Sequence, residues 1–270
     1  MGPRRARCMA TEVFEQNTGA KGSNEAAPLV RQILIQTKFE LLLTLRRGEN
    51  ILITLIVPVV LLIFFASLNI VPTVNGQTVN FLLPGILALA IMAAGMVNLG
   101  IATAYERYYG VLKRLGGSPL PRSGLIIAKI ISVLVLEVVQ VILLVGVAMV
   151  LYGWQLVGSP LLVLLVMALG TVTFAAIGLA MAGALRAEIT LAGANALFLL
   201  FVLLGGGILP LSHLPAPVAA IAQLLPAAAL TQALQATMSS GATFPGFALL
   251  VLSVWAAVVL LVAIRTFQWE

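Results

Sequence analysis

The sequence contains no aspartate, a single histidine (His213) and a single cysteine (Cys8). Without aspartate, the aspartate-rich metal motifs of membrane prenyl-transfer enzymes are excluded, and one histidine cannot supply the paired ligands of a zinc site. One cysteine excludes an internal disulfide framework. The phosphate-binding pattern Gly-x-x-x-x-Gly-Lys-Ser/Thr is also missing. We therefore expect that this chain binds no metal and no cofactor, and that any ATP is handled elsewhere.

Charge is scarce as well, since 9% of the residues are charged, 61% are hydrophobic and the mean hydropathy is +1.12. This composition predicts an integral membrane protein. The 15 Lys and Arg lie before residue 48, between Arg107 and Lys129, or at Arg186 and Arg265. Connections that alternate between basic and uncharged predict a polytopic protein with both termini in the cytoplasm. The net charge of +6 suits anionic lipid headgroups and a cytoplasmic partner better than nucleic acid, because the basic residues form no single patch.

Six apolar runs are long enough for the hydrocarbon core of a bilayer, which needs about 20 residues. We therefore expect an all-α polytopic fold with six transmembrane helices. Their predicted positions are Ile51–Leu68, Phe81–Ala104, Ile126–Tyr152, Pro160–Leu185, Ile189–Leu209 and Phe244–Ile264.

The long outer connection between the last two runs contains Pro210, Leu214, Pro215 and Pro226. Its second half is apolar, but proline breaks a helix interior. Pro226 divides the apolar stretch into two pieces of about ten residues, each too short to cross a bilayer at 1.5 Å per residue. We predict two external or re-entrant helices in the outer leaflet.

Two segments precede the first apolar run. Residues 1–27 are polar and are predicted to form a disordered cytoplasmic leader, ahead of a transmembrane domain over residues 28–270. The segment Pro28–Arg47 begins with a proline suited to a first helical turn. Four of its apolar residues, Val30, Leu34, Leu41 and Leu45, form one stripe at helical spacing, although Ile35 and Leu43 lie off this stripe. This pattern predicts an amphipathic helix along the cytoplasmic interface.

The connection between the second and third runs extends from Tyr105 to Arg122 and is rich in charge. We expect a short charged helix that ends at Gly116 and Gly117, followed by a rigid turn around Pro119. Such a protrusion is either a solvated turn or a docking element for a cytoplasmic protein.

Several of these segments resemble the ABC-2 type permeases, the membrane subunits of ABC exporters related to the daunorubicin-resistance permeases. The resemblance covers about residues 28–270. It is carried by the pair Glu106–Arg107, by the runs Gly110–Leu115 and Ser118–Arg122, by Gly206–Pro215 and by Leu224-Leu225-Pro226.

The resemblance implies a permease of the bacterial inner membrane that pairs with itself or with a similar chain. ATP and Mg would be held by separate ATP-binding subunits, which dock on the interfacial helix and on a coupling helix between spans 2 and 3. The residues that the resemblance assigns to coupling are Glu106, Arg107, Gly110, Lys113, Arg114, Ser118, Pro119 and Arg122.

Glu137 is the one acid inside a predicted span, and Gln140 shares its helix face. An ionisable residue in a membrane is expected to face the bundle interior or a wet cavity. Glu137 is therefore either a polar contact in a substrate path or coupling site, or a structural residue that is neutral or hydrogen-bonded to a neighbouring helix, for which Asn98 and Asn195 are candidate partners. We expect a hydrophobic or amphipathic cargo, such as a drug or a lipid, as in multidrug resistance. A membrane-embedded enzyme and an ATP-independent carrier, each using Glu137, are the alternatives.

Two spans carry pairs of small residues four positions apart, the spacing that lets membrane helices approach closely. The pairs are Gly100 with Ala104 and Gly178 with Ala182. We interpret both as packing surfaces.

Overall fold

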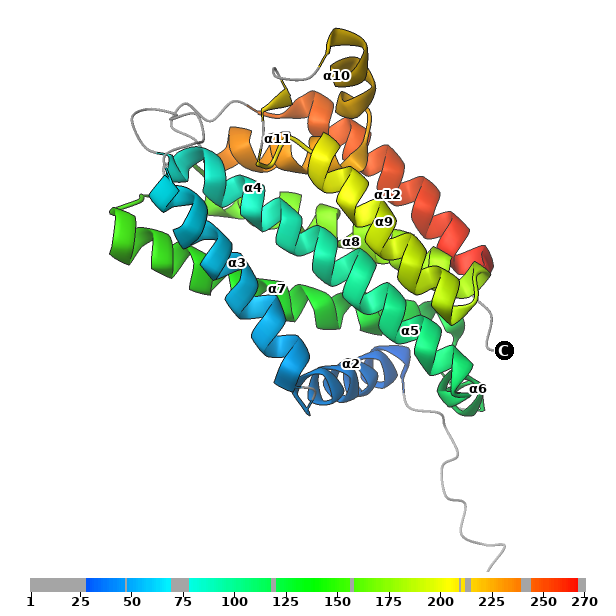
Figure 1. The fold of residues 1–270 in the computed structure, drawn as a ribbon. Coiled ribbons are helices and arrows are strands. Elements are labelled where there is room, and N and C mark those ends of the chain that lie inside the picture. The colour runs from blue at the N-terminus through cyan, green and yellow to red at the C-terminus, as the bar shows by residue number, and fades with distance from the viewer. Residues whose placement is uncertain are drawn as a thin grey trace, which may run out of the picture.

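The computed structural model describes residues 28–46, 48–68, 78–117, 120–155, 158–208, 210–211, 215–238 and 244–266. These residues form a helical bundle in which successive long helices run in alternate directions (Figure 1). The predicted leader, residues 1–27, lies outside the described residues. The bundle confirms the all-α polytopic membrane fold.

The long helices correspond to the predicted apolar runs. The second run is one continuous helix in three parts, in which a π-helical segment, η1, joins two α-helices. The elements are α3 (Gly48–Leu68), α4 (Val79–Met92), η1 (Ala93–Asn98), α5 (Leu99–Tyr108), α7 (Arg122–Tyr152), α8 (Pro160–Ala184), α9 (Ala187–Leu204) and α12 (Gly246–Thr266).

Five helices among the described residues are long and apolar enough to cross a membrane. They are the continuous helix Val79–Tyr108 together with α7, α8, α9 and α12. The apolar part of α3 that satisfies the same composition, Thr54–Leu68, is shorter. The prediction of six spans is thus matched in position by six helices, of which five have the full length.

The centre of the bundle is the continuous helix Val79–Tyr108, most of which is buried. It packs against α8, which in turn packs against α12 and α11. Large side chains fill the contact, since Met92, Met96 and Phe174 have no exposed surface. By contrast, α9 keeps most of its apolar surface exposed, as expected for a helix at the edge of a membrane bundle.

Two further helices lie at one end of the bundle, near the end of α5 (Figure 1). They are α2 (Leu29–Arg46) and α6 (Val111–Leu115). α2 packs on α7 and α3, and its buried residues are Ile33, Thr37 and Glu40. Three residues of the predicted apolar stripe, Val30, Leu34 and Leu45, are exposed, and Leu41 is half-buried. The polar face of this amphipathic helix therefore contacts the bundle, and the apolar face is free to contact lipid.

At the opposite end of the bundle lie α10 (Ala216–Gln223) and α11 (Pro226–Met238) (Figure 1). Their axes are bent by 81° at the break between them, which agrees with the predicted division of this stretch at Pro226. Pro226 is the buried first residue of α11, while Pro215 is exposed just before α10. Pro210 is half-buried, and Leu214 lies outside the described residues.

The fifth predicted run and the corresponding helix end at different residues. We expected the fifth run to continue to Leu209, but α9 ends at Leu204. Gly205, Gly206 and Gly207 follow it. Consecutive glycines lose backbone entropy in a helix and bury no side chain there, so the helix stops before them.

Candidate functional site

The segment predicted to form one charged helix is divided in the structure. α5 continues to Tyr108, then Gly110 makes a turn with φ of 71°, and the separate short helix α6 follows. Only glycine adopts this left-handed conformation without a steric penalty. Arg122 is the first residue of α7 and is exposed. Ser118 and Pro119 lie outside the described residues.

The coupling residues named from the sequence fall into two groups. On α6, Lys113 and Arg114 are exposed, while Leu112 anchors the helix in the core. On α5, Glu106 and Arg107 are part-buried and turn toward neighbouring helices. The charged side chains on α6 are therefore exposed at the surface, whereas those on α5 contact the bundle itself.

Arg107 binds the end of α8. Its guanidinium donates to the carbonyl oxygen of Gly183 at 2.5 Å and also to the carbonyl oxygen of Leu185. The last carbonyls of a helix lack intrahelical partners and carry partial negative charge. The planar guanidinium can serve two of them at once. Arg107 thus fastens α5 to the turn between α8 and α9.

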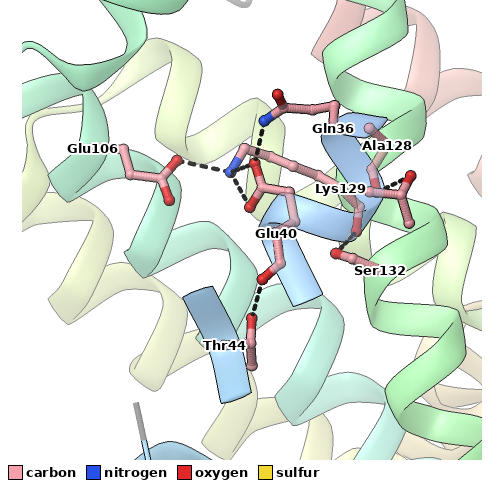
Figure 2. A network of polar contacts seen from close by, with 8 residues as sticks. Gln36, Glu40, Thr44, Glu106, Ala128, Lys129 and Ser132 are labelled. Carbon is pink, nitrogen blue, oxygen red and sulfur yellow. Dashed lines mark hydrogen bonds and ion pairs between the residues drawn. The ribbon is translucent and has the colours of Figure 1, made fainter. Parts of the chain in front are cut away.

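Glu106 belongs to a buried ion cluster that joins three helices (Figure 2). The ammonium of Lys129 on α7 lies 2.7 Å from a carboxylate oxygen of Glu106 and 3.0 Å from one of Glu40 on α2. Gln36 donates to Glu40 at 3.0 Å. The side chain of Lys129 is 1% exposed. The ammonium of Lys129 therefore forms ion pairs with two carboxylates from different helices.

Such a cluster contributes little net stability, because desolvation of the charges offsets their attraction. Removing one member is costly, however, because the others remain buried without a counter-charge. The cluster therefore specifies how α2, α5 and α7 sit together. We named Glu106 from the sequence but missed its partners. The available signal was Lys129, a lone base at the start of an apolar span, which requires an acid from a neighbouring helix.

Glu137 lies in the bundle interior, as expected, and is 1% exposed. The partner predicted for it was wrong, because its carboxylate accepts a hydrogen bond from Thr171 on α8 and not from Asn98 or Asn195. Asn195 is exposed on α9 and bonds the carbonyl of Leu191 in its own helix. It does not belong to this site. The threonine was missed because its hydroxyl gives no signal within an apolar run.

Three of the predicted polar residues, Asn98, Glu137 and Gln140, lie around the same cavity. Gln140 donates to the carbonyl oxygen of Thr54 on α3 at 2.8 Å, and Asn98 donates to the Thr54 hydroxyl at 3.3 Å. Together with Glu137 they line a cavity of about 80 Å³ between α2, α3, η1, α5 and α7. The same cavity reaches the ion cluster of Glu40, Glu106 and Lys129. The cavity thus places polar groups from both regions on one wall surface that is otherwise lined by apolar side chains such as Leu99 and Val133.

The comparisons with known proteins identify the class of this architecture. A family model described as ABC-2 type transporter matches residues 31–239. The match begins in α2, covers the buried ion cluster and the cavity, and ends just after α11. A search of curated proteins gave no match.

Proposed function

Because the chain belongs to the ABC-2 type transporter family, we propose that it drives export in partnership with a separate ATP-binding subunit. The family itself makes the chain a permease subunit of an ABC transporter. Beyond the family, we propose the direction of transport, the class of cargo and the route by which ATP hydrolysis on the partner moves the spans. The cargo is hydrophobic or amphipathic, a drug or a lipid, and the membrane is the bacterial inner membrane with both termini in the cytoplasm.

The observation that carries this proposal is the Lys129 cluster, because it links an interfacial helix to two membrane helices. In the proposal, the ATP-binding subunit docks on α6 and α2. A displacement of α2 moves Glu40, and a displacement of α6 moves α5 and Glu106. Both displacements act on Lys129, which sits at the start of α7. The spans then shift between two states that differ in which side is open.

The proposal also includes a second permease, either an identical chain or a similar one. The resemblance to ABC-2 permeases implies that two such membrane subunits act as a pair. The exposed apolar surfaces of α9, such as Leu199 and Leu203, supply area for lipid contact and for such pairing. Cross-linking in native membranes, followed by mass determination, distinguishes the homodimer from the heterodimer.

The first experiment is affinity purification of the tagged chain in mild detergent, with an assay for ATPase activity. We expect an ATP-binding subunit to co-purify. The double variant Lys113→Glu/Arg114→Glu reverses two exposed charges on α6 and should lower the recovered ATPase. Arg265→Glu, an exposed charge reversal near the end of α12, is the matched control and should leave recovery unchanged. Recovery of an intact permease without any ATPase would remove the exporter proposal.

A second variant separates docking from coupling. Glu106→Ala/Arg107→Ala alters inward-facing contacts, so we expect the ATPase to be recovered while its stimulation by cargo is lost. The cargo itself is tested with inverted vesicles that carry the complex. ATP-dependent accumulation of a fluorescent apolar dye is expected. Movement of small hydrophilic solutes alone, without binding of apolar compounds, would contradict the cargo class.

A further inference from the structure

The cavity lined by Glu137 contains an acceptor that nothing in the described bundle satisfies. One carboxylate oxygen of Glu137 accepts from Thr171. The other, Oε1, is buried and has no hydrogen-bond partner among the described residues. Buried carboxylate oxygens are normally paired, because leaving one unpaired costs free energy. Glu137 lines the cavity, so a hydrogen-bond donor that enters the cavity would lie near this unpaired oxygen and could satisfy it after a small shift of the side chain.

The charge balance of the cavity indicates the sign of that group. Among the described residues, its walls carry three acidic side chains, Glu40, Glu106 and Glu137, and one ammonium, that of Lys129. Lys129 already contacts the first two carboxylates. It lies eight residues before Glu137, about 12 Å along the helix axis. The described walls thus have more acidic than basic groups, and none of the described cations is paired with Glu137.

The neutral polar groups of the cavity, the amides of Gln140 and Asn98, also favour a ligand that donates hydrogen bonds. Gln140 and Asn98 each direct an amide N–H to Thr54. A side-chain amide that donates there retains its carbonyl oxygen as an acceptor. Beside these groups the walls are apolar, with Ala94, Val133 and Leu136 among them. The cavity therefore combines hydrogen-bond acceptors with hydrocarbon contact.

We infer that this cavity binds the ammonium group of an amphipathic alkylamine, with Glu137 as its counter-charge. An alkylammonium donates three hydrogen bonds and carries the missing positive charge. The volume of about 80 Å³ holds about six water molecules, or a headgroup of a few heavy atoms. Leu43 and Asn98 on the rim are exposed, so the alkyl chain can extend out of the cavity to the surface of the bundle.

An organic cation fits better than a metal ion. The described residues contain no group of three or more His, Cys, Asp or Glu side chains placed to hold a metal. Metal sites for hard cations collect several oxygen ligands around one point. Here Glu40 and Glu106 already share the ammonium of Lys129, and Glu137 lies about two turns further along α7, with apolar side chains such as Val133 and Leu136 beside it. This arrangement suits a ligand that has both a charge and an apolar part.

The inference rests on the proposed function, since the amine would be a cargo of the exporter, but its test needs no ATPase. The purified chain in lipid nanodiscs is titrated with tritiated decylamine, and binding to empty nanodiscs is subtracted. Tritiated decanol has the same chain without the charge and serves as the reference ligand. We expect saturable binding of decylamine and at least tenfold weaker binding of decanol.

The variant Glu137→Gln removes the charge while keeping the shape and should weaken decylamine binding at least tenfold, with decanol unchanged. Glu188→Gln makes the same substitution at an exposed position outside the cavity and should bind decylamine as the wild type does. Ala102→Leu adds bulk to the cavity wall without altering charge and should also weaken decylamine binding. Each variant is first required to elute as a single peak in detergent.

Equal binding of the two ligands to the wild type would overturn the inference. So would decylamine binding that survives both Glu137→Gln and Ala102→Leu. Those results would leave the exporter function intact, because recovery of the ATPase is measured independently. Conversely, decylamine binding that depends on Glu137 in a chain that recruits no ATPase would support the site and contradict the exporter.

Discussion

The ammonium of Lys129 lies 2.7 Å from the carboxylate of Glu106, and the lysine side chain is 1% exposed. This contact joins the beginning of α7 to the end of α5. Glu40 approaches the same ammonium from α2. In a low-dielectric interior, each of the three charges depends on the others for its compensation.

The first prediction concerns the loss of the central charge. Lys129→Met keeps the apolar stem but leaves Glu40 and Glu106 buried without a cation. We expect a loss of about 3–5 kcal/mol of unfolding free energy, the usual cost of breaking a buried pair. The measurement is unfolding of the purified chain in detergent, followed by tryptophan fluorescence.

The matched control is the neutral triple variant Lys129→Met/Glu40→Gln/Glu106→Gln. Because it leaves no uncompensated charge, its unfolding free energy should return close to that of the wild type. The triple variant should nevertheless show impaired ATP-stimulated transport, since the link between α2, α5 and α7 is gone. If Lys129→Met alone were as stable as the wild type, Lys129 would not be compensating the charges of Glu40 and Glu106 in the folded chain.

Much of the fold was predictable, because membrane helices are set by length, apolarity and turn residues. The break at Pro226, the position of α2 and the six long helices all follow from local patterns. The partner of each polar residue was harder to predict from the sequence. Glu137 was correctly placed in the interior, yet its partner Thr171 belongs to a different helix. A threonine in an apolar run carries no pattern, since its hydroxyl can also bond its own helix.

The candidate coupling residues show the same limit. The sequence places Glu106 and Arg107 in a charged connection, which is typical of an exposed segment. In the structure their contacts are with Lys129 and with the end of α8. Sequence alone could not distinguish these inward contacts from the exposed position of Lys113. Which way each side chain points depends on the helix that carries it, and the turn at Gly110 divides the segment into α5 and α6.

The second prediction tests the contact of Arg107 with α8. Arg107→Lys keeps the charge but cannot span two carbonyl oxygens with one planar group. We expect a loss of about 1–3 kcal/mol of unfolding free energy, typical of hydrogen bonds to a charged group. Amide hydrogen exchange at the turn between α8 and α9 should become faster. Unchanged exchange at that turn would indicate that other contacts hold it.

The third prediction concerns the opposite end of the bundle. The indole N–H of Trp255 on α12 donates to the carbonyl oxygen of Leu224, between α10 and α11, at 2.9 Å. Trp255→Phe removes the donor and retains an aromatic ring. We expect a cost of about 1 kcal/mol and faster amide exchange in α10. Exchange in α2 serves as the internal reference and should not change, because α2 lies at the other end.

The fourth prediction concerns the closest approach of α5 and α8. A Cβ atom on Gly100 would lie 2.9 Å from Cα of Gly178, and a Cβ atom on Gly178 would lie 2.7 Å from the carbonyl oxygen of Met96. Ala104 and Ala182 pack together one turn further along. The two small-residue pairs found in the sequence thus face each other. Close backbone contact of this kind is how membrane helices gain van der Waals energy.

Gly178→Leu should therefore force the central helices apart and cost about 1–3 kcal/mol through overpacking. The matched control is Gly146→Ala on α7, where an added Cβ meets no atom within 4 Å. That substitution should be neutral or stabilise by up to about 1 kcal/mol, because alanine favours helix. Thermal unfolding of both variants in one detergent gives the comparison. If Gly178→Leu unfolds at the same temperature as Gly146→Ala, the two helices are not in close contact at Gly100 and Gly178.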